Sequence, residues 1–517
     1  MRAIRYHLSL PRYGLQQLLG RRFPGVYHRA PFACVRADDI PVPALPRPGW
    51  VRIRPILAGI CGSDMGTVMG KNSPALSPFV SFPAVLGHEV VGRIAEIAAG
   101  GTESPRRAAP ETVDTGAAAT ATAGTVRGAN GELRVGDRVV VDPALGCEAR
   151  GLELCPACQR GEAYLCERNS EGPFAPGLIL GFCRDLPGSW AEELVAPAVQ
   201  TFRVPDEVSD EKAVLVEPFA VSLRAALRGL PQLGGAEYAA TAAEHAVTGT
   251  AQAVVSCAQP AVTGAEHFVP AAGAAAAGSE KILIIGGGTI GLTVLAALRL
   301  LELEVKAATR VSADVTIVAR HDFQQKLAIE LGASRVVRGG SDLLRAAEEL
   351  GRVRVHRPVI GPPVYTGGFD LVYDCIGSHR TIDQALRLTR GGGRIVLVGA
   401  AGRLPSIDWT FVWSRELTII GSAGYGRENR LPPSLAPLAA AALADRRPGQ
   451  DGDSAPHTFA LALELLRRHP DYPLERLITH RFPLSAWREA LAINVHHGPH
   501  RAVKSVFTFG QANQEPK

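Results

Sequence analysis

The chain has 517 residues, 46% of them hydrophobic and 20% charged, and its formal net charge is +5. That length exceeds what a single hydrophobic core usually serves, so two domains are expected. The small net charge gives no support to a nucleic-acid partner, and no uncharged apolar run is long enough for a membrane span or a signal peptide. We therefore expect a cytoplasmic protein that binds neither nucleic acid nor membrane. Its nine cysteines are better explained as metal ligands and reduced thiols than as disulfides.

The first part of the chain, to about residue 220, is rich in short strands separated by proline and glycine. Examples are Trp50–Ile56, Val90–Ile97 and Asp137–Val141, and this pattern indicates a β-rich domain rather than a βαβ repeat. Two tracts dominated by alanine and poor in aromatic residues interrupt the chain at 98–133 and 235–278. We predict that both are insertions outside the folded cores.

Three separated segments of this β-rich part carry side chains that bind zinc. Cys61 lies in GICGSD, His88 and Glu89 lie in LGHEVVG, and Glu217 lies in LVEPFA. Zinc binds thiolate sulfur, imidazole nitrogen and carboxylate oxygen, and a catalytic site leaves one position open. Each residue alone would more often be structural, but their joint occurrence beside glycine or proline favours one shared metal site.

A second set of candidate ligands is a group of four cysteines, Cys147, Cys155, Cys158 and Cys166. The Cys-Pro-Ala-Cys core lets two sulfurs of one turn face one tetrahedral ion. The alternative is a redox dithiol, but no thioredoxin-like βαβ pattern lies nearby. We predict a closed structural zinc site in a lobe at 147–166.

The segment Lys281–Leu292, KILIIGGGTIGL, reads as a buried parallel strand, a glycine turn and the start of a helix. In a dinucleotide-binding turn the three glycines permit the bend, the approach of a pyrophosphate and the packing of helix on strand. The alternative is an ordinary tight turn. The predicted cofactor contacts here are Gly286, Gly288, Thr289, Ile290 and Gly291.

Further strands are predicted at Val315–Ala319, Phe369–Tyr373, Arg394–Val398 and Leu417–Ile420, with helices between them. Together they indicate a doubly wound parallel sheet. Because strand carboxyl ends face the ligand crevice in such sheets, Ile376, Gly377, Val398 and Gly399 are predicted to line the cofactor. The basic, proline-rich stretch Arg352–Pro363 has no interpretation.

Cofactor choice depends on the end of the strand at Val315–Ala319. Enzymes that use NAD present an acid there to the ribose 2′-hydroxyl, whereas Arg320 follows this strand and could hold a 2′-phosphate. We predict a preference for NADP. Asp322 keeps NAD open, since a small shift in alignment would restore an acid near the ribose.

The chain resembles the zinc-dependent medium-chain alcohol/polyol dehydrogenases over nearly its whole length outside the two alanine-rich tracts. The matching segments are, in order, GICGSD, GHEVVG, VGDRVVV, the four-cysteine lobe, VEPFAV, ILIIGGGTIGL, DCIG, GGGRIVLVG and KSVFTF. The resemblance implies a GroES-like catalytic domain at 1–220, a Rossmann domain binding NAD(P) at 221–428, and a segment at 429–517 that returns to the catalytic domain. Cys147 stands further from Cys155 than the family spacing.

The resemblance also implies roles for the metal ligands. Cys61 and His88 match the first two ligands of the catalytic zinc, and Glu217 matches the carboxylate used in the polyol branch. Glu89 matches a carboxylate that ligates directly or exchanges with water, and the sequence leaves open which carboxylate binds at rest.

Three more positions follow from the resemblance. Ser63 matches the hydroxyl that hydrogen-bonds the substrate oxygen, although it could merely cap a turn. Gly66 stands where many relatives carry a histidine, so we expect water or the cofactor ribose to serve in place of the usual proton relay. Lys504 matches a basic residue that touches the cofactor pyrophosphate, the alternative being an exposed edge-strand lysine.

The resulting expectation is a zinc-dependent NAD(P) oxidoreductase that interconverts a secondary alcohol, polyol or sugar and its carbonyl by hydride transfer. Alternatives are an aldehyde- or amino-alcohol-specific enzyme of the formaldehyde or threonine branches, a zinc-free reductase of the same superfamily, and a non-catalytic nucleotide-binding protein. A homodimer or homotetramer formed near Leu417–Ile420 is expected by resemblance.

Overall fold

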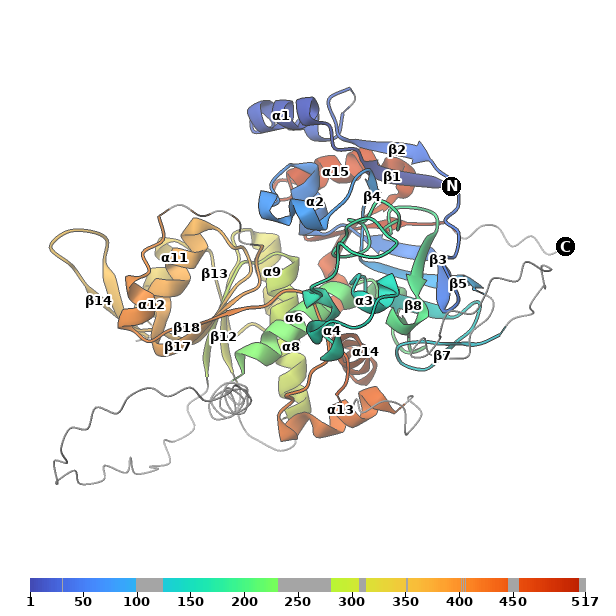
Figure 1. Cartoon of the computed structure of the whole chain (residues 1–517). Coiled ribbons are helices and arrows are strands. Elements are labelled where there is room, and N and C mark those ends of the chain that lie inside the picture. The colour runs from blue at the N-terminus through green and yellow to red at the C-terminus, as the bar shows by residue number, and fades with distance from the viewer. Residues whose placement is uncertain are drawn as a thin grey trace, which may run out of the picture.

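The computed structural model describes residues 1–29, 31–98, 124–230, 280–305, 313–349, 352–400, 402, 404, 406–444 and 455–510. The predicted insertion at 235–278 lies outside the described residues, as does most of the tract at 98–133. Two sheets dominate the described chain, and helices α6 and α8 lie between them (Figure 1). No helix within the described ranges is long and apolar enough to cross a bilayer.

The β-rich domain is organised on a seven-stranded sheet in the order β10–β8–β5–β3–β20–β19, in which β9 also pairs with β3. Its strands are β3 (Trp50–Gly59), β5 (Val90–Ile97), β8 (Arg138–Val141), β9 (Leu194–Pro197), β10 (Thr201–Arg203), β19 (Ile478–Pro483) and β20 (Lys504–Thr508). Strand β3 is central because β5, β9 and β20 all pair with it. A smaller sheet joins β2 (Val35–Asp39), β1 (Arg2–Tyr6) and β4 (Ala84–Val85).

Two strands of the larger sheet come from the end of the chain. β20 runs antiparallel to β3, with Val506 opposite Gly59 and Phe507 opposite Ala58. The helices of this segment are α13 (Ala436–Leu443), α14 (Thr458–Arg468) and α15 (Trp487–Val495). The last part of the chain therefore completes the sheet that the first part begins.

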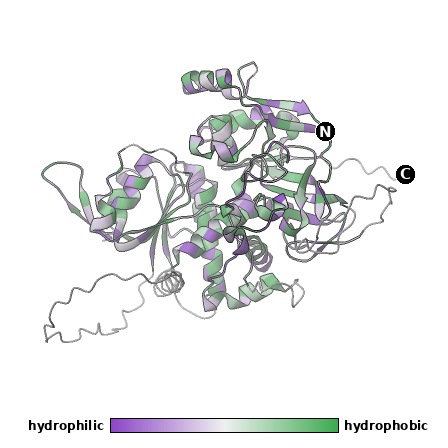
Figure 2. Cartoon of the chain, viewed as in Figure 1, coloured by the Kyte–Doolittle hydropathy of each residue, from purple (hydrophilic) through white to green (hydrophobic). Residues whose placement is uncertain are grey.

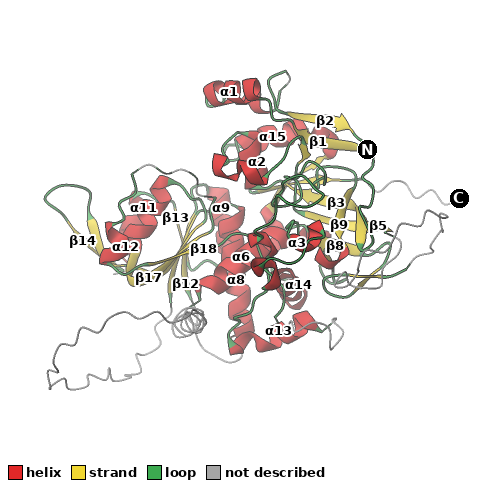
Figure 3. Ribbon diagram, in the orientation of Figure 1, coloured by secondary structure: helices red, strands yellow, loops and turns green. Residues whose placement is uncertain are grey.

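The second sheet has six parallel strands in the order β13–β12–β11–β16–β17–β18. They are β11 (Lys281–Ile285), β12 (Asp314–Val318), β13 (Arg335–Val337), β16 (Phe369–Asp374), β17 (Thr389–Leu397) and β18 (Thr418–Gly421), and the helices are α8 (Thr289–Val305), α9 (Asp322–Glu330), α10 (Ser341–Glu349), α11 (His379–Leu388) and α12 (Thr410–Ser414). Helices lie on both sides of this sheet (Figure 3). The α/β fold predicted from the sequence, a β-rich domain plus a doubly wound parallel sheet, is confirmed.

One hydrophobic core joins the two sheets. Helix α6 (Val216–Gly229) buries Phe219 and Leu223 against Leu295 of α8 and Phe459 of α14. Apolar residues are concentrated where these helices meet at the centre of the molecule (Figure 2). Burial of apolar surface contributes ~25 cal/mol of stability per Å², so this shared core binds the two sheets to each other.

Two segments differ from the sequence interpretation. Strands β6 (Val126–Arg127) and β7 (Glu132–Leu133) form a hairpin whose Val126 and Leu133 are buried in the β-rich core, so the predicted insertion extends too far at its C-terminal end. Each of these strands has only two residues and stands in a tract of alanine and glycine, so the sequence pattern did not reveal either strand. The uninterpreted stretch Arg352–Pro363 belongs to an antiparallel hairpin of β14 (Val353–His356) and β15 (Val364–Gly367).

An excursion between β1 and β2 carries helix α1 (Leu10–Leu19) and the turn η1 (Pro24–Tyr27). Tyr13 of α1 donates a hydrogen bond to the Gly70 carbonyl, 3.4 Å away, just after α2 (Gly62–Val68). Val26 and Tyr27 pack in the same core as Trp487 of α15. The excursion thus covers α2 and α15 on the outside of the β-rich domain.

The cysteine lobe contains the short helices α3 (Cys147–Arg150) and α4 (Pro156–Gln159). Arg150 is 1% exposed, and its guanidinium donates to five backbone carbonyls, those of Leu145, Glu171, Phe174, Ala175 and Gly177, at 2.9–3.2 Å. A single side chain therefore fixes the lobe to the loop that follows it.

Replacing Arg150 by Met removes these five donors and leaves buried carbonyls without partners. Each such group costs about 1–3 kcal/mol, so we expect the thermal midpoint to fall by several degrees. Differential scanning calorimetry measures the change. The control is Arg184→Met, at an exposed arginine, and equal midpoints for the two variants would contradict this role of Arg150.

Candidate active site and metal centres

The Cys61 and His88 segments are joined by a carboxylate. Cys61 is the N-cap of α2, and its N–H donates to Oδ2 of Asp64 at 3.0 Å. Oδ1 of Asp64 accepts from the Gly87 N–H at 3.2 Å and lies 3.5 Å from Nδ1 of His88. Asp64 thus brings both candidate ligands to one place and orients the imidazole.

The charge around His88 suits a cation. His88 is 4% exposed. Burial alone would lower the pKa of its imidazole, but the neighbouring Asp64 and Cys61 raise that pKa well above its usual value. The other ring nitrogen, Nε2, lies 3.4 Å from the hydroxyl of Ser63. The imidazole therefore has Asp64 on one side and Ser63 on the other.

Glu217 approaches the same place from the first turn of α6 and is 8% exposed. Burial raises the pKa of its carboxyl group to about 7, while His88 beside it lowers that pKa and Glu89 raises it further. Cys61, His88 and Glu217 come together in the same part of the molecule. Among the described residues, however, their donor atoms do not all lie within 4.8 Å of one another.

The Glu89 carboxylate forms an ion pair with a buried lysine. The ammonium of Lys504 donates to both Glu89 oxygens, at 2.6 and 2.7 Å, and to the carbonyl of Ile60 at 3.3 Å. Lys504 is 2% exposed and Glu89 is fully buried. Gly59 leaves the necessary space, because a Cβ there would lie 1.7 Å from a Glu89 oxygen.

The position of Lys504 rules out the alternative of an exposed edge-strand lysine, because its side chain is buried and β20 lies between β3 and β19. An ammonium group has three donors, and all three are used within the β-rich domain. A contact between Lys504 and the cofactor pyrophosphate stays a prediction.

Two tyrosines near the metal candidates could not be identified from the sequence. Tyr164 lies in the cysteine lobe. Burial raises the pKa of its hydroxyl, and the nearby charge of Glu217 raises that pKa further. Tyr425, which follows β18, is 3% exposed and interacts with the Glu217 carboxylate. The two rings pack edge to face with centroids 6.0 Å apart. No motif marks either residue, whereas Asp64 could have been found from its place three residues after Cys61.

The predicted relay position also differs from the pattern in relatives. A Cβ at Gly66 would lie 2.2 Å from Oδ1 of Asn72. The Asn72 amide donates to the Thr67 hydroxyl at 2.7 Å and to the Ser63 carbonyl at 3.3 Å. Asn72 thus occupies the space beside residue 66.

The four lobe cysteines come together. Their sulfurs all lie within 4.8 Å of one another, and Cys147 is only 3.6 Å from Cys166 despite its longer spacing in sequence. Backbone N–H groups of Cys155 and Arg168 donate to two of the sulfurs, at 3.4 and 3.3 Å. All described cysteines are free of disulfides. The arrangement fits one tetrahedral zinc ion.

The glycine turn follows β11 as predicted, and α8 begins at Thr289. A Cβ at Gly291 would lie 1.7 Å from the Gly286 carbonyl oxygen, whereas one at Gly288 would meet nothing within 4 Å. Helix and strand therefore pack tightly while Gly288 leaves an open face for phosphate. The Thr289 hydroxyl donates to the Val503 carbonyl at 2.9 Å, and Ile290 packs against the shared core.

The strand ends beside this turn come together as expected. Ile376 is 49% exposed, and its side chain lies where a Cβ on Gly286 would be. The N–H groups of Ile376 and Gly377 donate to Asp374, at 2.9 and 3.0 Å. Val398 and Gly399 follow β17, and their N–H groups donate to the Asp374 carbonyl. These four N–H groups are therefore used within the loops, which leaves the side chains and carbonyls of the same residues to face a cofactor.

At the end of β12, Arg320 is exposed. Asp322 forms an ion pair with Arg338 at 2.6 Å. Both side chains of this pair are exposed, so NADP preference stays a prediction and Asp322 keeps NAD open.

Comparisons with known proteins agree with this geometry. Residues 47–206 match the alcohol dehydrogenase GroES-like domain, and residues 303–441 match the zinc-binding dehydrogenase domain. L-idonate 5-dehydrogenase of Vitis vinifera is 25% identical over 437 residues, covering 84% of this chain and 81% of that protein. L-threonine 3-dehydrogenase of Deinococcus radiodurans is 27% identical over 391 residues, covering 75% and 78%.

Among solved structures, alcohol dehydrogenase TADH from Thermus sp. ATN1 aligns with a TM-score of 0.58 and 18% identity, covering 99% of this chain and 100% of that one. This likeness shows the fold. Together with the two matched domains and the sequence relatives, it leads to one conclusion. The chain belongs to the zinc-dependent medium-chain alcohol dehydrogenase family and is an NAD(P)-dependent oxidoreductase.

Proposed function

We propose that the protein interconverts a secondary alcohol, polyol or sugar and its carbonyl, using a zinc ion held by Cys61, His88 and Glu217. One observation carries this proposal. Adjacent residues where β20 begins contact both halves of the site. The Val503 carbonyl accepts from Thr289 at the start of the cofactor helix, and Lys504 binds Glu89 beside the metal candidates. Metal and nicotinamide are thereby expected side by side.

The residues present fit the implied groups. A thiol, an imidazole and a nearly buried carboxylate whose pKa is raised to about 7 by burial form a donor set that a divalent cation would stabilise. The open face at Gly288 suits a pyrophosphate. Because Lys504 neutralises Glu89, we propose Glu217 as the ligand at rest.

When bound, the zinc ion supplies Lewis acidity, which lowers a hydroxyl pKa as it lowers that of water from ~16 to ~7, and the nicotinamide carries the hydride. Nε2 of His88 is the ligand nitrogen, since Asp64 lies at Nδ1. The Ser63 hydroxyl, whose Oγ lies 3.4 Å from Nε2, would accept a hydrogen bond from the substrate hydroxyl. Tyr164 and Tyr425 exclude water beside Glu217.

The substrate class rests on Glu217 and on the relatives. A carboxylate in place of a second sulfur ligand resembles the polyol branch, and L-idonate 5-dehydrogenase is named for a sugar acid. The second candidate is an amino alcohol of the threonine type, favoured by the relative from Deinococcus radiodurans. A panel of polyols, sugar acids and L-threonine assayed by absorbance of the reduced cofactor separates the two.

We further propose that residues 1–220 and 429–517 form the catalytic domain, with 221–428 as the cofactor domain, and that β18 joins copies into a dimer or tetramer. β18 is an edge strand, and the backbone exposed there supports the assembly. The described cysteines are free thiols, which supports a cytoplasmic location.

Removing one metal at a time separates the two zinc sites. Glu217→Gln is expected to lower zinc from about two ions per chain to about one, and to lower kcat by about 10³-fold or more, with little change in thermal midpoint. Cys155→Ser is the matched variant: it loses the other ion and lowers the thermal midpoint strongly. Metal analysis and calorimetry measure both. Wild-type turnover by Glu217→Gln would refute the assignment.

Cofactor preference is tested at the end of β12. Arg320→Leu is expected to lower kcat/KM for NADP by about 10- to 100-fold, the value of a charge-assisted hydrogen bond of about 1.5–3 kcal/mol, and to leave kcat/KM for NAD unchanged. The control is Lys326→Gln on the exposed surface of α9. A wild-type protein that strongly prefers NAD would overturn the NADP proposal.

A further inference from the structure

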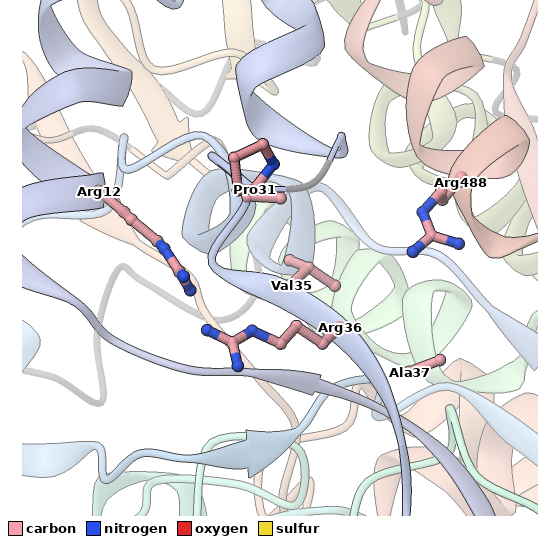
Figure 4. A pocket seen from close by; sticks show the side chains of 7 residues that line it. Arg12, Pro31, Val35, Arg36, Ala37 and Arg488 are labelled. Carbon is pink, nitrogen blue, oxygen red and sulfur yellow. The ribbon is translucent and has the colours of Figure 1, made fainter.

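Three arginines line a hollow of about 310 Å³ on the face of the β-rich domain that carries α1. Arg12 comes from α1, Arg36 from β2 and Arg488 from α15. Figure 4 shows the guanidinium ends of Arg12 and Arg36 turned toward each other, with Arg488 entering from the opposite side. The other lining residues are Pro31, Ala33, Val35 and Ala37, so no carboxylate lines the hollow.

These guanidinium groups lack counter-charges. Among the described residues, no carboxylate forms a hydrogen bond or ion pair with Arg12, Arg36 or Arg488; Arg488 lies over the Trp487 ring, 4.4 Å from its centroid. Asp38, two residues after Arg36, is engaged by His7 at 2.6 Å and by Arg5 at 3.6 Å. The carboxylate of Asp38 is therefore already paired with other side chains.

The surrounding segment is positive as well. Residues 8–37 contain five arginines and no aspartate or glutamate. Nearby, burial lowers the pKa of His28, and the positive charges of Arg29, His496 and Arg488 lower it further. Cations brought together without an acid repel one another, and an anion among them would remove that repulsion.

We propose that Arg12, Arg36 and Arg488 form a binding site for a phosphate group, separate from the metal centres and the glycine turn. Planar guanidinium forks bind phosphate oxygens in pairs, and three of them suit a dianion better than a single carboxylate. The apolar wall of Pro31 and Val35 leaves room for the group that carries the phosphate.

Two sources share this chemistry: a soluble phosphate ester and a lipid headgroup. Leu10 and Leu18, on the same helix as Arg12, are 75% and 82% exposed, so an anionic lipid surface is a physical alternative to a free ligand. The experiment therefore includes both sources.

The first test titrates inorganic phosphate against the thermal midpoint of the full chain at constant ionic strength. Phosphate raises the midpoint of wild type and of the charge control Arg354→Gln/Arg357→Gln, which also removes two positive charges, on the exposed β14–β15 hairpin. In Arg12→Gln/Arg36→Gln the apparent phosphate affinity falls about 100-fold, about tenfold for each arginine removed. Alcohol turnover without phosphate is the same in all three proteins, which shows that the double variant folds.

The second test assigns the source. Glycerol 3-phosphate in solution and vesicles of phosphatidylcholine with and without phosphatidic acid are compared by thermal shift and by co-sedimentation. A response to either that is lost in Arg12→Gln/Arg36→Gln supports the site and names its source. Equal responses of Arg12→Gln/Arg36→Gln and of the charge control Arg354→Gln/Arg357→Gln to every probe would overturn the proposal.

Discussion

The buried ion pair between Lys504 and Glu89 is the constraint on which the catalytic half of the molecule depends. It joins the last strand to the segment before β5, and the same ammonium binds the carbonyl of Ile60, next to Cys61. Removing one partner of such a pair costs about 3–5 kcal/mol, because the other charge stays buried alone. The positions of Cys61 and His88 therefore rely on a residue more than four hundred positions away in the chain.

A second set of contacts connects the cysteine lobe with the catalytic residues. Arg224 on α6 binds Glu162 of the lobe at 3.1 Å and Glu428 at 3.0 Å. Glu162 lies two residues before Tyr164, whose ring packs against Tyr425 beside Glu217. A zinc ion bound by the lobe would thus do more than fix a surface loop, since the turn that it would hold also carries Tyr164 beside Glu217.

Local patterns predicted some parts of this structure and could not predict others. The glycine turn and the strands of the parallel sheet follow from short-range spacing, and the meeting of four cysteines follows from ligand chemistry. Spacing alone did not show whether Cys147 belongs to the four-cysteine site. Its position there depends on the turn that α3 makes before Cys155. The role of Lys504 could not be read, because only the fold shows that Glu89 faces it. Strands β6 and β7 were hidden because their few apolar residues stand among alanine and glycine.

The position of β20 beside the central strand β3 has a consequence for biosynthesis. Strand β3 leaves the ribosome early, yet its neighbour β20 emerges only after every strand of the parallel sheet. Until then Glu89 has no counter-ion, while the parallel sheet, whose strands all lie between residues 281 and 421, already has every one of its members. Vectorial synthesis would thus complete the nucleotide-binding half before the metal-binding half, so a truncated product could bind cofactor without being able to build the catalytic zinc site.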